Sequence, residues 1–167
     1  MEEIVRVQRA TIDEHIRAEN AHDWPAVYNT FTQNESAFYD VMPLHAHFAG
    51  MTGVKDFYQA AHNAFPDFRI DVFAEYDLPG YSIREVTVSG THEGDWCGVA
   101  GTGRPVKFHL IGIFVFGNGE NAGKLLAERI YFDNDTVLQQ IRGTQEASSV
   151  PDFAHADNRR KAATAQS

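Results

Sequence analysis

The sequence has one cysteine, few basic residues and no long apolar run. The lone Cys97 excludes an intrachain disulfide and a zinc site built from cysteines. Fourteen Lys and Arg against 23 Asp and Glu give a net charge of −9, which argues against nucleic-acid or anionic-lipid partners. No apolar run approaches the ~20 residues of a membrane span, and the acidic start Met1–Glu3 is unlike a secretory signal. These absences predict a cytoplasmic protein without nucleic-acid or membrane partners.

Bulky aromatic residues are abundant by contrast. The 167 residues, enough for one domain, include 12 Phe, 6 Tyr and 2 Trp. Such side chains line a core, a pocket or a subunit interface.

The first half of the chain has a helical period. Residues 2–22 contain neither Gly nor Pro and place Ile12 and Ile16 on one helix face. Asp23 is expected to cap a second helix, and Thr52 a third helix that ends at Pro66.

After Pro66 the apolar period changes to two, which is typical of strands. Asp135 is expected to cap a short closing helix that Gly143 ends. The predicted strands cover residues 36–43, 68–72, 81–93, 106–116 and 125–133.

This order of elements predicts an α+β domain over residues 1–143, with a curved antiparallel sheet packed on N-terminal helices as a cone. Residues 144–167 lack a sustained apolar face and are predicted to form an arm or a disordered tail. A cone has an interior, which predicts a pocket for a small hydrophobic molecule. The sheet's outer face is also apolar, which predicts a homodimer.

Three segments resemble the SnoaL-like polyketide cyclase family of the nuclear transport factor 2-like superfamily. The matching segments are residues 50–58 with 65–68, residues 90–94 with 102–106, and residues 128–133 with 138–141. The resemblance implies a cone-shaped α+β fold, commonly a dimer, and ring closure by aldol condensation without cofactor or metal. The superfamily also includes ketosteroid isomerases and scytalone dehydratases.

The resemblance also implies positions for catalytic groups. The acid/base Asp of the cyclases corresponds to Ile130, their His falls opposite Gly112, and their Asn falls near Tyr39. Ile and Gly cannot titrate, so these two replacements remove the usual proton-transfer groups.

The same alignment indicates which side chains face the pocket. Positions that share the parity of Gly112 and Ile130 are expected to point inward. His62 lies beside the apolar stripe of the third predicted helix and is expected at the open end of the pocket. The predicted substrate-binding residues are Phe108, Leu110, Gly112, Phe114, Ile130, Phe132 and His62.

Four residues are candidates for catalysis, each with a structural alternative. Glu128 in an aromatic pocket would be tuned toward acid/base work, or it is a solvated strand residue. Asp133 could act as a base or accept hydrogen bonds at a helix start. Tyr39 could polarise a carbonyl or belong to the core. His92 could relay protons or serve the fold.

A metal site is a weak hypothesis. His45 and His47, two residues apart on a predicted strand, would project from one face, but no third ligand follows them. We therefore expect neither a metal nor a cofactor.

The sequence favours a cofactor-independent acid/base enzyme of the aldol cyclase, isomerase or dehydratase type. Its substrate would be a small, hydrophobic, polyketide-like carbonyl compound, with Tyr39 donating to the carbonyl and Glu128 or Asp133 moving the proton. The alternative is a binding protein of the same fold that holds a small hydrophobic ligand without catalysis. A dimeric interaction module that uses the outer sheet face is a weaker third hypothesis.

Overall fold

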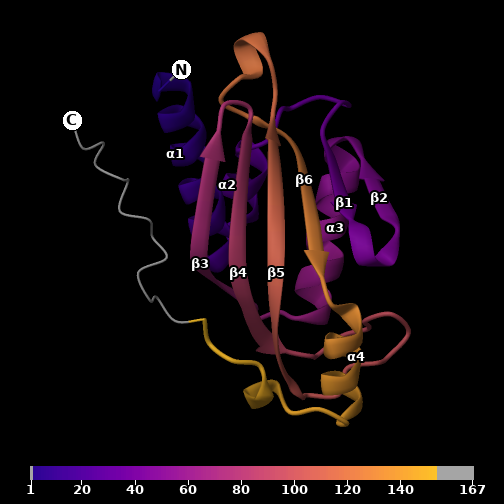
Figure 1. The fold of residues 1–167 in the computed structure, drawn as a ribbon. Coiled ribbons are helices and arrows are strands. Elements are labelled where there is room, and N and C mark those ends of the chain that lie inside the picture. The colour runs from indigo at the N-terminus through magenta and orange to yellow at the C-terminus, as the bar shows by residue number, and fades with distance from the viewer. Residues whose placement is uncertain (1, 154–167) are drawn as a thin grey trace, which may run out of the picture.

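The computed structural model describes residues 2–153 and has three helices packed on one face of a six-stranded sheet (Figure 1). A fourth helix, α4, lies at one end of the sheet (Figure 1). The helices are α1 (Glu2–Asn20), α2 (Trp24–Asn29), α3 (Gly50–Ala64) and α4 (Asn134–Arg142). The strands are β1 (Phe38–Val41), β2 (Ala46–Ala49), β3 (Arg69–Leu78), β4 (Tyr81–Thr91), β5 (Pro105–Phe116) and β6 (Leu125–Phe132).

The strand order is β2-β1-β6-β5-β4-β3, which confirms the α+β class with a curved sheet packed on N-terminal helices. Neighbouring strands are antiparallel except β1 and β6, which are parallel. This parallel pair brings the first strand beside the last, with Tyr39 opposite Glu128. The β1–β6 pairing thereby builds one wall of the interior from the two ends of the sequence.

The predicted parity of the long strands is confirmed. On β5, Phe108 and Phe114 are buried against the helices, whereas Ile111 is exposed on the other face. The β5–β6 register pairs Gly112 with Ile130 and Phe114 with Glu128, so these residues share the inner face. The register therefore places Glu128 on the face that the helices cover.

Two helix starts differ from the sequence prediction. Helix α3 begins at Gly50, whose φ of +70° turns the chain directly out of β2, instead of being capped by Thr52. Helix α4 is capped by Asp133, which accepts hydrogen bonds from the backbone N–H groups of Asp135 and Thr136, so the prediction that Asp135 caps it is wrong.

Two other predicted helix boundaries are confirmed. Asp23 caps α2 by accepting a hydrogen bond from the Ala26 N–H at 3.2 Å. Gly143 ends α4 with a φ of +77°, a conformation that glycine adopts without a Cβ clash.

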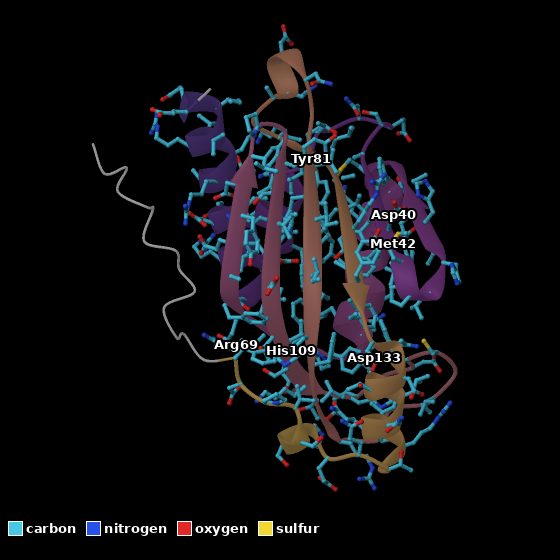
Figure 2. All side chains as sticks on the ribbon, in the orientation of Figure 1. Asp40, Met42, Arg69, Tyr81, His109 and Asp133 are labelled. Carbon is cyan, nitrogen blue, oxygen red and sulfur yellow. The ribbon has the colours of Figure 1, made fainter. Side chains whose placement is uncertain are left out.

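The chain after α4 runs back to the outer face of the sheet (Figure 2). Val150 is buried, Asp152 pairs with Lys107 at 2.5 Å, and the Phe153 ring lies 4.6 Å from the His109 ring. Residues 144–153 of the predicted arm thus contact the domain, and the rest of the predicted arm or tail, residues 154–167, lies outside the described residues. Among residues 2–153, none of the helices has both the length and the apolarity to cross a membrane.

Candidate active site

A partly open cavity of about 100 Å³ lies between the inner face of the sheet and the helices. Its lining is apolar and aromatic apart from a few polar groups, chiefly two carboxyl groups and two phenols. The lining residues are Glu19, Tyr39, Phe57, Tyr58, Ala61, Phe65, Phe68, Ile70, Val86, Val88, Ser89, Trp96, Val106, Phe108, Leu110, Glu128, Ile130 and Phe132.

Several residues predicted from the sequence line this cavity. Two are the catalytic candidates Tyr39 and Glu128. The apolar residues that belong to both the prediction and the lining are Phe108, Leu110, Ile130 and Phe132.

Other predicted substrate-binding residues lie outside the lining. Phe114 packs in the core with its ring 5.7 Å from the His15 ring. Gly112 is buried beneath the Phe114 ring, and a Cβ added to Gly112 would lie 3.2 Å from that ring. His62 packs against Trp24 and His22 on the helical side.

Two predicted catalytic residues also lie elsewhere. The exposed carboxylate of Asp133 is engaged in capping α4, and the Thr136 hydroxyl that donates to it lowers its pKa. His92 is fully buried behind Phe65, with Nδ1 3.0 Å from the Thr102 hydroxyl. Neither residue lines the cavity, and each has a structural contact: Asp133 with the start of α4, and His92 with Thr102 and Phe65.

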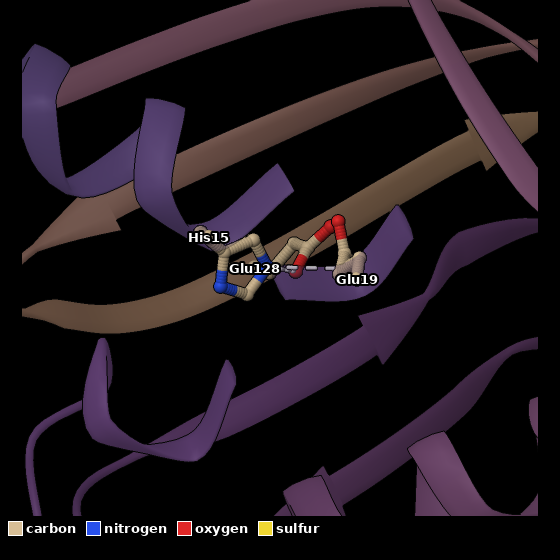
Figure 3. A group of neighbouring side chains, drawn as sticks. All are labelled: His15, Glu19 and Glu128. Atoms are coloured by element: carbon tan, nitrogen blue, oxygen red, sulfur yellow. Dashed lines mark ion pairs between the residues drawn. The ribbon is translucent and has the colours of Figure 1, made fainter. Parts of the chain in front are cut away.

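Glu128 belongs to a buried polar cluster with His15 and Glu19 (Figure 3). The Tyr58 hydroxyl is the fourth member of this cluster. Only 4% of Glu128 is exposed, so its interpretation as a solvated strand residue is wrong. The Tyr58 hydroxyl lies 2.9 Å from Glu19 Oε1 and 3.1 Å from Glu128 Oε2. His15 Nε2 lies 3.3 Å from Glu128 Oε2 and 3.5 Å from Glu19 Oε1. Residues from α1, α3 and β6 thus meet at the cavity wall.

The hydrogen bonds around His15 identify its protonated nitrogens. The Thr30 hydroxyl donates to the Val27 carbonyl at 2.6 Å, so its oxygen accepts from His15 Nδ1–H at 2.7 Å. Nε2 then faces the two carboxylates and the Tyr58 hydroxyl. A proton on Nε2 makes His15 an imidazolium that pairs with the carboxylates.

The electrostatics of the cluster favour this protonated imidazole. Burial by itself would lower the pKa of His15, but the charge of Glu19 and the hydrogen bond to Glu128 outweigh burial and raise that pKa to about 10. Burial raises the pKa of Glu128, and the hydrogen bond from His15 offsets only part of this effect. Glu128 is therefore a carboxyl group that takes up a proton more readily than one in water.

Tyr39 stands beside this carboxyl group on the neighbouring strand. Its ring stacks on Phe57 at 3.7 Å between centroids, and the β1–β6 register places it directly opposite Glu128. Burial, with the charge of Glu128, raises the pKa of Tyr39 well above its ordinary value. The pKa of Tyr58 is raised in the same way, mainly by burial. Both phenols hence remain protonated donors at neutral pH.

His15, Glu19 and Glu128 also form the one group of three within residues 2–153 whose donor atoms lie close enough to hold a metal ion, all within 4.8 Å of one another. A histidine nitrogen with two carboxylates is a ligand set that zinc accepts. The Tyr58 hydroxyl lies among these donors and hydrogen-bonds with each of them. This group is not the metal site considered from the sequence, which paired His45 with His47. His47 lies on the surface, with Nδ1 2.6 Å from Asp40 Oδ1.

Three members of the cluster were missed in the sequence. Ile12, His15 and Glu19 follow one another at helical spacing on one face of α1, a polar pair at the end of an apolar stripe. That pair was a usable signal, because such residues are rarely buried without a partner. Tyr58 gave no signal, since it fits the apolar stripe of α3.

The whole domain matches one protein family. The SnoaL-like polyketide cyclase family covers residues 6–141 of the chain. The protein belongs to this family. The match includes every residue of the cavity lining, from Glu19 to Phe132.

Solved structures share the fold of this SnoaL-like protein at low sequence identity. AclR from Streptomyces galilaeus, a proposed hydroxylase, superposes with a TM-score of 0.67 at 19% identity, over 86% of this chain and 97% of AclR. IdmH from Streptomyces antibioticus, a proposed polyketide cyclase, superposes with a TM-score of 0.66 at 19% identity, over 81% of this chain and 98% of IdmH. A proposed SnoaL-like polyketide cyclase from Jannaschia sp. CCS1 superposes with a TM-score of 0.69 at 16% identity, over 81% of this chain and 93% of that protein. No curated protein matches the sequence.

Proposed function

We propose that this SnoaL-like protein is a cofactor-independent acid/base enzyme that acts on a small, hydrophobic, polyketide-like carbonyl compound. The reaction would be an aldol cyclisation, an isomerisation or a dehydration. The observation that carries the proposal is Glu128, a buried carboxyl group with a raised pKa in the wall of an apolar cavity.

Each polar group of the cavity has a role in this proposal. Glu128 takes a proton from the carbon beside the substrate carbonyl and later returns it. Tyr39 or Tyr58 donates a hydrogen bond to the carbonyl oxygen as negative charge develops there. His15 lies behind the carboxyl groups and is a positioning residue for Glu128.

The proposal accounts for the lost titratable residues at Ile130 and Gly112. Glu128 lies two residues before Ile130 on β6 and therefore faces the same side of the sheet. A carboxyl group at this position reaches the cavity, as the usual aspartate would from position 130.

Hydrogen–deuterium exchange tests the proton transfer without knowledge of the natural substrate. Phenylacetone in D₂O is incubated with the protein, and deuterium at its α-carbon is measured by NMR. We expect wild-type protein to accelerate exchange and Glu128→Gln to lose most of that acceleration. Asp133→Asn is the control: it removes a carboxylate that directly follows β6 but lies outside the cavity, and it is expected to keep the acceleration.

Further variants test the remaining roles. Tyr39→Phe is expected to slow the exchange, because it removes one donor to the carbonyl oxygen. The catalytic role of His92 stays a prediction, and His92→Gln tests it in the same assay. Equal exchange with wild-type protein and Glu128→Gln would refute the proposal.

The alternative is a binding protein without catalysis. It is supported by the apolar lining and by Ile130 at the usual catalytic position. Two carboxyl groups in the cavity wall favour the enzyme instead. Binding of phenylacetone without accelerated exchange would decide for the binding protein.

We propose further that the protein is a homodimer formed through the outer face of the sheet. Tyr76, Tyr81, Ile111 and Tyr131 are exposed there, and strand pairing places them on one side. Ile111→Glu is expected to lower the mass measured by light scattering to that of a monomer. Val7→Glu, a similar change on α1, is the control. A cytoplasmic location stays a prediction from composition.

A further inference from the structure

We infer that the cavity binds a compact ligand whose polar head is a protonated amine. The inference rests on the proposed function in that it names the substrate class for the same cavity: a small carbonyl compound that also carries an ammonium group. It follows from the charges, hydrogen-bonding groups and rings of the lining.

The cavity lining contains carboxyl groups but no basic side chain. Glu19 and Glu128 both line it, whereas the lining has no Lys, Arg or His. His15 lies behind the two carboxyl groups and is fully buried. Arg84, also buried on the inner side of β4, is paired with Asp77 at 2.9 Å and lies outside the lining. An anionic ligand would therefore meet carboxyl groups without a compensating cation.

The hydrogen-bonding groups of the cluster include more acceptors than donors. Two carboxylates offer four oxygen atoms, each of which can accept. The donors that contact them are His15 Nε2 and the Tyr58 hydroxyl, since His15 Nδ1–H is used by Thr30. A ligand with N–H donors fills this deficit, and an ammonium group offers three such donors.

The charge of the cluster points the same way. His15 is one basic group that faces two carboxyl groups, Glu19 and Glu128, in a buried site. An unpaired buried charge is costly, and a ligand cation would balance it. The protein's net charge of −9 also favours the approach of a cation over that of an anion.

Aromatic rings complete a site for a cation with an apolar body. The cavity is lined by Phe57, Phe65, Phe68, Trp96, Phe108 and Phe132. The faces of such rings attract cations, and their area buries an apolar ligand. A volume of about 100 Å³ suits a ligand whose buried part is roughly one ring and its head group.

A series of matched ligands tests the inference directly. Benzylamine, benzyl alcohol and benzoate share one ring and differ in the charge of the head group. Their affinities for the full-length protein at pH 7 are measured by isothermal titration calorimetry. We expect benzylamine to bind about tenfold or more tightly than benzyl alcohol, because its hydrogen bonds are charge-assisted, and benzoate to show no binding.

Two variants locate the preference in the cavity. Glu19→Gln and Glu128→Gln are each expected to reduce the advantage of benzylamine over benzyl alcohol by about tenfold. Glu85→Gln is the matched control, because Glu85 pairs with Ile111 on the outer face and is expected to keep the wild-type preference. The wild-type series decides the question even if a cavity variant fails to fold.

The outcomes separate this inference from the proposed function. Preferred benzylamine binding without accelerated exchange of phenylacetone supports an ammonium ligand and refutes the enzyme, so that the ligand would be bound without being a substrate. Exchange with equal binding of benzylamine and benzyl alcohol, or with binding of benzoate, overturns the inference and leaves the enzyme standing. Failure of all three ligands to bind also overturns the inference.

Discussion

The imidazole of His15 and the carboxyl group of Glu128 lie 3.3 Å apart, Nε2 to Oε2, and join the first helix to the last strand. Each is almost completely buried. Their contact couples the cavity wall to the stability of the domain, because either group alone would be an uncompensated charge in an apolar interior.

The free energy of unfolding is expected to fall as the pH rises from about 6.5 toward 10. The pKa of folded His15 is about 10 and its ordinary value is 6.5, so the folded state binds this proton more tightly. The stabilisation is complete below pH 6.5 and is lost as the pH passes through 10, on the order of a few kcal/mol in total. The raised pKa of Glu128 adds a loss of the same sign, starting near its ordinary value of 4.5.

Urea unfolding at a series of pH values measures this effect. His15→Asn removes the titrating imidazole, so the difference between variant and wild-type protein isolates its contribution. A wild-type pH profile that parallels the His15→Asn profile between pH 6.5 and 10 would contradict the prediction.

Removal of His15 alone is expected to cost more stability than removal of His15 together with the Glu128 carboxylate. His15→Leu leaves Glu19 and Glu128 without their cation, and loss of one partner from a buried pair costs about 3–5 kcal/mol. Adding Glu128→Gln to His15→Leu removes one uncompensated carboxylate and is expected to restore part of the loss. Chemical denaturation at pH 8 of the two single variants and the double variant measures the coupling. Additive losses would show that the two side chains do not interact.

The Tyr58 hydroxyl is expected to stabilise the fold through its buried hydrogen bonds. Tyr58→Phe leaves oxygen atoms of Glu19 and Glu128 without this donor and should cost about 1–3 kcal/mol. Tyr28→Phe is the matched control on the partly exposed helical side, where a change within about 0.5 kcal/mol is expected. Thermal unfolding of both variants provides the comparison, and equal shifts in Tm would argue against a special role for Tyr58.

Asp133 is expected to act on helix α4 and not on the chemistry. Asp133→Ala removes the cap and should lower the free energy of unfolding by about 1 kcal/mol. Asp135, two residues later, does not cap α4, so Asp135→Ala should cost less. Deuterium exchange into phenylacetone should be the same in both variants after correction for folded protein. Loss of exchange in Asp133→Ala alone would return Asp133 to the list of catalytic residues.

The helical and strand periods were readable from the sequence because each is a local property. The placement of Ile12 and Ile16 on one helix face and the apolar period of two after Pro66 reflect which side chains face one core. Helix caps were less predictable, because Asp133 and Asp135 both have the side chain that a cap requires. Only the backbone path out of β6 decides that Asp133 accepts the N–H groups.

The candidate site was partly readable. Parity on β6 placed Glu128 on the inner face with Ile130, and Tyr39 was expected near the pocket. The alternation along β6 does not predict which helix residues cover the inner face of the sheet. His15 and Glu19 on α1 complete the cluster, and no pattern within β6 refers to them.

The sequence by itself determined an α+β domain with an apolar interior, because alternating and helical apolar patterns can be buried in few ways. The tertiary structure decided the ionisation of that interior. The pKa values of His15 and Glu128 depend on which charges lie within a few ångströms and on how much water is excluded. Both quantities arise only when helix α1 packs across strand β6.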